Sequence, residues 1–524
     1  MNVRISFIAM NMAFALVLVV GALWAANAIY FEQSYFIMMF KYPWYQLTLS
    51  GDRGGSFLAS VFPISQSKEL ESEGGGKALS IPVLVYHGIV GKAEGDNVTT
   101  RDFKEQMMAL KDAGWETVSI EEFQAFMKGE LQLSEKSFLL TFDDGRKDSY
   151  YPVDPILRAL DYEAVMFVIT NQSIGEKGKA THFYLSEKEL KHMQSTGRWD
   201  IQSHGKFAHE LYATGPNGET GHFYSNLLWV PEEERPETPE EFQERIYEDL
   251  RISKEEIEES LGISVATIAF PFGDFGHNLF ADSNFELAKG ILLISAKEHY
   301  SHGFYQWWEG EGFTFNYPRE DVLTVKRLEV LPNWSGEALL QILEQGMSKS
   351  LPYQESFLQN NAWLSNWGSF DMQPGKGLVF LAEGGQAGAS AVLDGTGGWE
   401  DYEVKARVNL PSQTGVFIWV RFQDANNNAA CNFGLDFVHA EQVFKGEKRV
   451  IKGVRGVTPL KEGDFTVSAR VQGRTIQCLV EGEIVVESTF LEPDLNRGGV
   501  GFKMWDEQIG KSQLLVRSLE VQPL

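Results

Sequence analysis

Between residues 80 and 350, short apolar runs alternate with stretches of helical spacing. Runs typical of buried strands lie at residues 81–86, 115–120, 137–142, 164–169, 199–202 and 265–270. Between them, Phe103, Met107 and Leu110 share one helical stripe, and Pro239 begins a long charged helix that ends at Gly262. Strands that alternate with helices predict an α/β domain with a parallel sheet, either open or closed into a barrel.

After about residue 358 the hydrophobic period changes to two. Val404, Ala406 and Val408 alternate with polar residues, and residues 416–420 and 465–471 repeat the pattern. Turns rich in Gly, Asn and Asp separate these runs, and no convincing helical pattern interrupts them. The sequence therefore predicts an α/β domain at residues 79–350 and an all-β sandwich at residues 359–524.

The N-terminal segment has the pattern of a membrane anchor. No charged residue occurs from Ile5 to Phe31, a run long enough to cross a bilayer. Residues 26–28 offer a small-x-small cleavage pattern, so removal as a signal peptide is the alternative. We expect residues 1–31 to be the anchor or signal segment, residues 32–78 a stalk, and the domains beyond them to lie outside the cytoplasm. Membrane contact would run through residues 5–31, and the protein would be secreted if residues 1–28 were cleaved.

Composition narrows the possible partners. The 524 residues are 43% hydrophobic and 23% charged, which is a globular composition, with a formal net charge of −26. Most of the acidic excess lies in the first 355 residues, and such a surface repels phosphate, so we expect no nucleic-acid partner. Two cysteines, Cys431 and Cys478, are too few for a Cys-rich zinc site. Both fall on core-facing positions of predicted strands, where a disulfide and two buried free thiols are equally open.

Candidate catalytic groups follow two of the predicted strands. Asp143 and Asp144 end the strand at residues 137–142, and His204 and His209 follow the strand at residues 199–202. Strand ends carry the active site in β/α folds. One carboxylate can bind a cation while its neighbour stays free to take a proton. Two imidazoles and one carboxylate make a three-ligand set that leaves room for water, as in catalytic metal sites.

These motifs resemble those of a known family. Thr-Phe-Asp-Asp-Gly at residues 141–145, Ser203-His204 with His209, and Phe270-Pro271-Phe272-Gly273 match in order the motifs of polysaccharide deacetylases, carbohydrate esterase family 4. The resemblance covers roughly residues 80–350. The five-residue His spacing and the helix at residues 240–250 are similar to the branch of poly-β-1,6-N-acetylglucosamine deacetylases.

The resemblance implies a fold, a cofactor and residue roles. It implies a distorted (β/α) barrel of NodB type that is accompanied here by the β-sandwich and the N-terminal transmembrane helix. Asp143 would be the catalytic base, and Asp144, His204 and His209 would hold a divalent metal, zinc or else cobalt or nickel. Residues Phe270, Pro271, Phe272 and Gly273 would bind substrate. In this branch a Leu-x-x-x-His motif lies near the N-terminal edge; Leu84-Val-Tyr-His87 resembles it and makes His87 the general acid.

Two positions depart from the family pattern, and one predicted partner is missing. Ala269 stands where most members carry an arginine that steers the basic aspartate, and Arg146 stands where an aromatic residue is common. No carboxylate is a clear partner for His87, and Glu329 is only a guess.

The C-terminal sandwich resembles concanavalin A-type lectin/glucanase (laminin-G-like) domains. The resemblance rests on strand pattern, on Trp-Glu-Asp-Tyr at residues 399–402 and on Gly-Gly-Val-Gly at residues 498–501. Exposed tryptophans, here Trp363, Trp367, Trp399 and Trp505, could stack on sugar rings.

Three functions are compatible with these observations. The first is a metal-dependent N-deacetylase of an N-acetylated cell-surface or exported polysaccharide of a biofilm or cell wall. The second is a glycan-binding pseudoenzyme, which Ala269 motivates, and the third is a glycosidase activity of the sandwich, for which no carboxylate pair stands out. Because Asp143, Asp144, His204, His209 and His87 are all present, we favour the enzyme.

Overall fold

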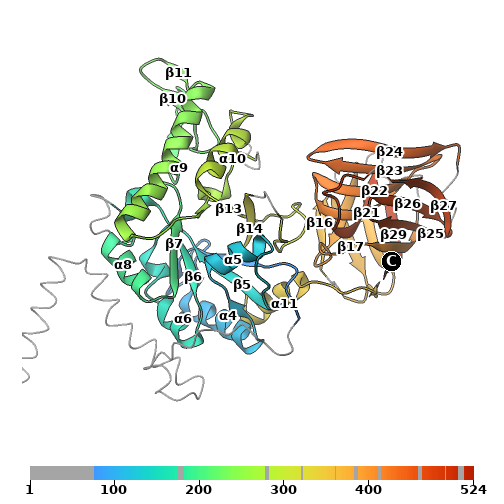
Figure 1. Cartoon of the computed structure of the whole chain (residues 1–524), viewed down its shortest axis with the longest axis horizontal. Helices are drawn as coiled ribbons and strands as arrows, with labels where there is room; N and C mark the ends of the chain where they lie inside the picture. The colour runs from blue at the N-terminus through green and yellow to red at the C-terminus, as the bar shows by residue number, and fades with distance from the viewer. Residues whose placement is uncertain are drawn as a thin grey trace, which may run out of the picture.

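A computed structural model describes most of the chain as two domains (Figure 1). It describes residues 76–174, 182–277, 283–319, 323–359, 362–382, 387–410, 415–457, 463–489, 491–505 and 513–524. The predicted anchor at residues 1–31 and nearly all of the predicted stalk lie outside these ranges. Among the described residues, no helix combines the length and the apolar character needed to cross a bilayer.

The first domain is a closed barrel of seven parallel strands. Their order is β1-β14-β13-β12-β7-β6-β5, and pairing between β1 and β5 closes the ring. Along the chain these strands are β1 (Val83–Tyr86), β5 (Ser137–Phe142), β6 (Ala164–Val168), β7 (Trp199–Ser203), β12 (Thr267–Ala269), β13 (His302–Gln306) and β14 (Thr324–Glu329). The sequence pattern was compatible with an open parallel sheet and with a barrel, and the structure has the barrel.

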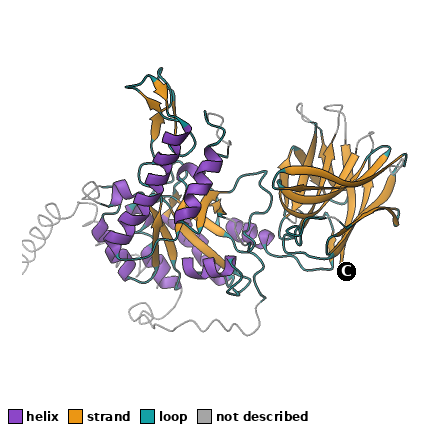
Figure 2. Ribbon diagram, turned by 45° about the horizontal axis from the view of Figure 1, so that its top comes forward, coloured by secondary structure: helices purple, strands orange, loops and turns teal. Residues whose placement is uncertain are grey.

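Helices surround the barrel strands (Figure 2). They are α4 (Thr100–Asp112), α5 (Ile120–Met127), α6 (Asp154–Leu160), α7 (Thr170–Ser173), α8 (Glu187–Ser195), α9 (Pro239–Leu261), α10 (Ala288–His299) and α11 (Gly336–Gly346). The long charged helix is confirmed as α9, which Thr238 caps at its start and Gly262 ends in a left-handed conformation. The strand predicted at residues 115–120 is only β4 (Glu116–Thr117), because Ser119 is already the N-cap of α5.

Smaller strand pairs decorate the barrel domain. They are β2 (Ile89–Val90) with β3 (Val98–Thr99), β8 (Leu211–Ala213) with β9 (Thr220–His222), and β10 (Trp229–Val230) with β11 (Arg235–Pro236). In Figure 1, β10 and β11 extend beyond one end of α9.

Strand alternation divides the apolar residues into two layers. Leu84, Leu140 and Phe142 contribute to the large core that also takes in the apolar faces of α4, α8 and α9. Leu139 and Val325 belong to a second, smaller cluster formed by the opposite face of the strands, inside the barrel. Apolar residues fill this interior, so polar side chains that continue the inward face lie at the strand ends.

The second domain is a β-sandwich, as predicted. One sheet has the order β17-β18-β29-β20-β25-β26-β27 with β15 paired to β29, and the other has the order β16-β19-β28-β21-β22-β23-β24. The strands are β15 (Tyr353–Glu355), β16 (Trp363–Trp367), β17 (Ser369–Gln373), β18 (Gly377–Leu381), β19 (Gly388–Leu393), β20 (Tyr402–Asn409), β21 (Gly415–Asp424), β22 (Asn427–Phe433), β23 (Phe437–Phe444), β24 (Glu447–Arg455), β25 (Asp464–Gln472), β26 (Thr475–Val480), β27 (Glu483–Ser488), β28 (Gly499–Trp505) and β29 (Gln513–Pro523). Because β15 pairs with β29, the sandwich pairing begins at Tyr353, before the predicted start at residue 359.

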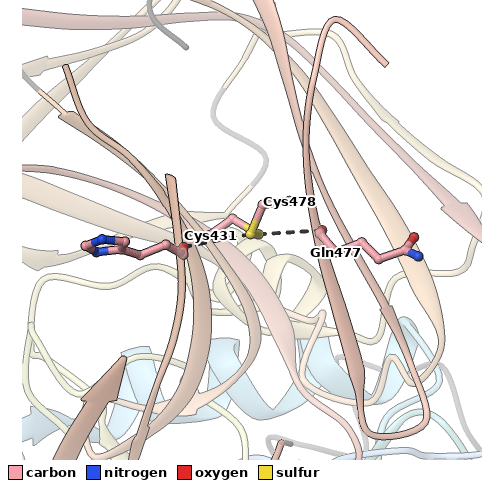
Figure 3. Close-up of a disulfide and its surroundings, with 4 residues drawn as sticks. Cys431, Gln477 and Cys478 are labelled. Carbon is pink, nitrogen blue, oxygen red and sulfur yellow. Dashed lines mark hydrogen bonds between the residues drawn. A yellow bond between two sulfur atoms is a disulfide. The ribbon is translucent and has the colours of Figure 1, made fainter. Parts of the chain in front are cut away.

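A disulfide joins the two sheets of the sandwich. Cys431 on β22 bonds to Cys478 on β26, and both cysteines are fully buried (Figure 3). Their Cα atoms are 5.5 Å apart, within the usual span of such a bridge. Of the two alternatives left by the sequence, the structure therefore has the disulfide.

The tryptophans of the sandwich only partly follow the sequence expectation. Trp363 and Trp399 are 2% and 5% exposed and pack in the sandwich core, so the expectation that they are exposed was wrong. Trp505 is 45% exposed and stacks on Trp367. Period-two alternation does not show which of these large rings a neighbouring loop or strand covers.

Specific polar contacts join the barrel to the sandwich. Thr314 Oγ1 donates a hydrogen bond of 2.5 Å to the buried carboxylate of Asp394. The backbone N–H of Gly397 donates to Tyr317 Oη, and the Trp399 indole N–H donates to the Lys349 carbonyl at 2.6 Å. The sandwich is thus held against one side of the barrel.

Asp200 on β7 gives a test of barrel stability. Burial, together with the negative charges of Glu121 and Glu122, raises the pKa of this carboxyl to about 6. The folded state therefore binds a proton more tightly than the unfolded chain, whose Asp has a pKa of about 3.9, and stability is lost as the pH rises from about 4 to 6. Asp200→Asn should raise the free energy of unfolding of the barrel by about 1–2 kcal/mol at pH 7, with no gain below pH 4.

Urea unfolding at pH 4 and pH 7 measures this difference. Asp371→Asn, an exposed position on β17, is the matched control and should change little at either pH. Equal stabilisation by Asp200→Asn at both pH values would show that the ionised carboxylate is not the cause.

Candidate active site

A cavity lined by titratable and aromatic side chains lies at the carboxyl ends of the barrel strands. Its volume is about 610 Å³. Residues from five strand ends line it, together with nearby loop side chains: His87, Asp96, Asp143, Asp144, His204, His209, His222, Phe272, Gly273, His277, Gln306, Trp307, Trp308 and Glu329. All five residues that the sequence nominated for catalysis and metal binding are in this set.

Asp143 is held by an arginine that the sequence analysis missed. Arg327 on β14 donates from Nη1 to Asp143 Oδ1 at 2.6 Å and from Nη2 to Oδ2 at 2.7 Å, and both side chains are buried. Burial alone would raise the pKa of Asp143, but the charges of Arg327 and His204 and the Arg327 hydrogen bonds together lower it. Asp143 is therefore a carboxylate at neutral pH, as a proton acceptor must be.

An arginine on another strand takes the place of the one that most family members carry at the position of Ala269. Ala269 on β12 is fully buried inside the barrel. Arg327, two strands away in the ring, supplies the guanidinium that Ala269 lacks. Asp143 is thus paired with an arginine although position 269 is an alanine.

Asp144 lies on a sharp turn beside two imidazoles. Its φ is 72°, in the left-handed region, and Gly145 follows with φ 70°. Asp144 Oδ1 is 3.1 Å from His209 Nε2 and 3.5 Å from His204 Nε2. Burial opposes ionisation, but the interaction of the carboxylate with the two nearby histidines holds the pKa of Asp144 well below its usual range.

These three residues fit a divalent metal. Their ligand atoms lie within 4.8 Å of one another, and Asp144 Oδ1 is buried and accepts no hydrogen bond from the described residues. His204 Nδ1 lies 2.8 Å from the Ala269 carbonyl and, as the donor, leaves the Nε2 lone pair directed at the cluster. Two imidazoles and a carboxylate suit zinc, and also cobalt or nickel.

Phe272 fixes the orientation of His209. The Phe272 ring stacks between His209, at 4.7 Å, and His222, at 4.3 Å. His222 Nδ1 in turn lies 2.7 Å from Asp274 Oδ2. The φ of Phe272 is 60°, a strained value for a bulky residue, and the stacking on both faces holds the ring in this position.

Residues 270–273, which the sequence predicted to bind substrate, differ in their position relative to the cavity. Phe272 and Gly273 line the cavity. Phe270 and Pro271 are buried and do not line it, and their contact with substrate stays a prediction. Phe270 instead packs against Tyr224 and Phe275 in the core.

His87 ends β1 and faces a carboxylate. Its Nδ1 is 3.3 Å from Glu329 Oε1, the residue that the sequence named only as a guess. Burial lowers the pKa of His87, but the carboxylates of Glu329, Asp143 and Asp144 raise it by more. His87 is therefore disposed to carry a proton near neutral pH.

A buried aspartate on α9 shapes the loop that carries the histidines. Asp249 Oδ2 accepts hydrogen bonds from the Lys206 N–H and the Tyr224 hydroxyl, and Oδ1 accepts from the Phe207 N–H. These bonds fix the chain between His204 and His209, and they give the long charged helix its role at the site.

One feature of the sequence could have pointed to Arg327 and Glu329. In β14, Arg327 and Glu329 continue the inward face of Val325, so two charged residues stand at alternate positions of a barrel strand. Charges at that spacing have to be paired when they are buried. Their partners, Asp143 and His87, lie about 180 to 240 residues earlier in the chain, and only closure of the barrel between β14, β1 and β5 brings them together.

His204 should be essential for metal retention. Loss of a group that merely orients a ligand costs about 10–100-fold in metal affinity, and loss of a ligand should cost more. We expect purified His204→Ala protein to contain far less than stoichiometric metal by elemental analysis. His192→Ala, at an exposed position of α8, is the matched control and should keep its metal. Stoichiometric metal in His204→Ala would contradict the ligand set.

Comparison with known proteins agrees with the site. Residues 130–285 match the family model described as polysaccharide deacetylase. YxkH of Bacillus subtilis (strain 168), named as a polysaccharide deacetylase, is 33% identical over 128 residues, 24% of this chain and 43% of that protein. A poly-β-1,6-N-acetyl-D-glucosamine N-deacetylase of Staphylococcus aureus (strain MSSA476) is 27% identical over 177 residues, 34% of this chain and 54% of that protein.

One of the solved structures that the chain matches is a de-N-acetylase from Aggregatibacter actinomycetemcomitans. It is 20% identical, with a TM-score of 0.42, over 50% of this chain and 98% of that one. The chain spans less than two thirds of the length of each curated relative named above. By its sequence match, the barrel that carries this site is a polysaccharide deacetylase domain.

Proposed function

We propose that the protein is a metal-dependent N-deacetylase of an N-acetylated cell-surface or exported polysaccharide. It would hydrolyse acetamide groups of the glycan to free amines and acetate. The observation that carries the proposal is the pairing of Asp143 with Arg327 beside the cluster of Asp144, His204 and His209. The relatives named as poly-β-1,6-N-acetyl-D-glucosamine N-deacetylases support this substrate class.

Asp144, His204 and His209 would hold the metal. When bound there, a divalent ion would lower the pKa of water and polarise the acetyl carbonyl. His204 keeps its orientation through the Ala269 carbonyl, and His209 keeps its own through the Phe272 ring.

Asp143 and His87 would move the protons. Asp143 keeps its negative charge through Arg327 and accepts the proton of the attacking water. As the C–N bond breaks, His87 donates a proton to the departing amine nitrogen, and Glu329 stabilises the imidazolium that supplies it. The products are acetate and an amine-bearing sugar.

The paired state of Asp143 weighs against a pseudoenzyme. The pseudoenzyme alternative rested on Ala269, and Arg327 supplies a guanidinium on both carboxylate oxygens of Asp143. The proton acceptor, the three metal ligands and the proton donor all line one cavity.

We also propose that both domains lie outside the cytoplasm, with residues 5–31 as the membrane contact. The disulfide between Cys431 and Cys478 supports this, because such bonds persist in oxidising compartments. Protease added to intact spheroplasts should degrade both domains. Full protection of the domains would contradict the topology.

Incubation with a polymer of N-acetylglucosamine tests the proposed reaction. Acetate and new free amines should appear in equal amounts with the wild-type chain. Asp143→Asn, which keeps the size of the side chain and removes the proton acceptor, should lower the rate by about 10²–10⁴-fold. Equal rates for the two proteins, or no acetate from the wild type, would contradict the proposal.

A further inference from the structure

A second cavity lies between the barrel and the sandwich. Its volume is about 420 Å³. The barrel contributes Tyr305, Trp308 and Lys326. The sandwich contributes Asp424 at the end of β21 and Asn426 in the turn that follows. Neither domain forms this cavity alone.

A row of stacked rings lies between this cavity and the catalytic cavity. His277 stacks on Phe275 at 4.0 Å and on Trp308 at 4.4 Å. Phe275 lines the interdomain cavity, His277 lines the catalytic cavity, and Trp308 lines both. Trp308 is thus common to the two cavities, and aromatic faces of this kind stack on sugar rings.

The charge of the interdomain cavity opposes that of the whole protein. The chain carries a formal charge of −26, yet four basic and two acidic residues line this cavity. The two acidic groups are already engaged: Glu311 accepts a hydrogen bond from the Tyr305 hydroxyl at 2.6 Å, and Asp424 lies 3.3 Å from Arg319. The cavity is thus a local basic site in an acidic molecule.

Three of the basic groups have no carboxylate partner among the residues that the structure describes. Lys326 Nζ donates to the Phe313 carbonyl, and an Arg497 Nη donates to the Pro318 carbonyl. Lys289 Nζ lies over the Phe275 ring at 5.4 Å. Carboxylates such as Glu311 and Asp394 act on Lys326 only from beyond ion-pair distance, and each basic group has further N–H donors for a ligand.

We propose that the interdomain cavity binds an anionic sugar of the glycan, at a site distinct from the acetamide that is cleaved. This inference rests on the proposed function and adds to it the class of polymer: one in which N-acetylated sugars occur with sugars that carry a carboxylate or a phosphate. Lys289, Lys326 and Arg497 attract the anion, and Trp308 and Asn426 contact the sugar ring and its hydroxyl groups. The sandwich therefore takes part in choosing the polymer.

Binding of matched oligosaccharides to the full chain tests the charge directly. The probe alternates N-acetylglucosamine with a carboxylate-bearing sugar, and its methyl ester is the neutral twin. We expect the acid to bind about tenfold more tightly than the ester at low salt, with the difference shrinking as salt is added. A phosphate-bearing oligomer in a third arm shows which anion is preferred. Equal affinity for acid and ester would overturn the proposal.

Variants locate the effect in this cavity. Lys289→Gln with Arg497→Gln should remove the preference for the acid and raise KM for it about tenfold, with kcat and the KM for the ester unchanged. Lys405→Gln, an exposed change of the same charge on β20, should keep the preference. If the double variant does not fold, Lys289→Gln alone, at an exposed position, should lose about threefold in affinity for the acid. A preference that survives these changes would overturn the proposal.

The outcomes separate this inference from the proposed function. If the wild-type chain prefers the acid but releases no acetate from either oligomer, the proposed function fails and the anion site stands. If it releases acetate from both oligomers without distinguishing them, the proposed function stands and the anion site fails.

Discussion

Replacing His87 with alanine is expected to lower kcat for acetate release by about 10²–10⁴-fold, the usual contribution of a positioned general acid or base. The physical reason is the leaving group. An amine departs readily only when it is protonated. His87 lies outside the cluster of proposed metal ligands and faces Glu329. The nearby carboxylates raise its pKa and favour its protonated form. The measurement is steady-state turnover of N-acetylglucosamine oligomers together with metal analysis of the same sample.

Metal content distinguishes the possible roles of His87. It should be unchanged in His87→Ala, because His87 is not in the cluster of Asp144, His204 and His209. Loss of the metal would make His87 a ligand, and near-normal turnover would show that another group protonates the amine.

Glu329→Gln gives the pH test of the same role. Glu329 raises the pKa of His87, so its neutralisation should lower that pKa. The protonated imidazole would then be lost at a lower pH, and the alkaline limb of the profile of kcat against pH should move toward neutral pH. An unchanged alkaline limb would mean that His87 is not the titrating acid.

Replacing Arg327 with methionine should damage both stability and turnover. The change leaves the buried carboxylate of Asp143 without its partner, and such a loss costs about 3–5 kcal/mol of folding free energy. Without the guanidinium, burial raises the pKa of Asp143, so the carboxylate becomes a poorer proton acceptor at neutral pH and kcat should fall by at least about 10²-fold. Urea unfolding and turnover measure the two effects separately.

A double variant separates the folding effect of Arg327 from its catalytic effect. Arg327→Met with Asp143→Asn removes both charges, so it should recover most of the lost stability while remaining inactive. Arg327→Lys should recover part of the activity, since an ammonium keeps the charge but cannot bond both carboxylate oxygens in parallel. Wild-type turnover in Arg327→Met would show that Asp143 does not depend on this pair.

Local sequence patterns were sufficient to predict most strands, the long helix and the site residues that follow strand ends. Asp143 and His204 could be nominated because each follows a predicted strand, and parallel strands bring their carboxyl ends to one face of the barrel. The predicted helix from Pro239 to Gly262 is found as α9 because its capping residues and apolar spacing agree.

Long-range pairing explains what the sequence did not predict. The Arg327–Asp143 pair depends on closure of the barrel through β1, which no local spacing encodes. The same holds for the disulfide, because Cys431 and Cys478 lie on different sheets, and for the cavity shared by Trp308 and Asn426 of the two domains.

The most direct test of the account is acetate release as a function of metal occupancy in the full chain. Protein stripped with a chelator should release no acetate from N-acetylglucosamine oligomers, and stepwise addition of zinc should restore the rate in proportion to bound metal, up to one ion per chain. Acetate release that persists in the stripped protein, or full metal occupancy without acetate release, would contradict the account.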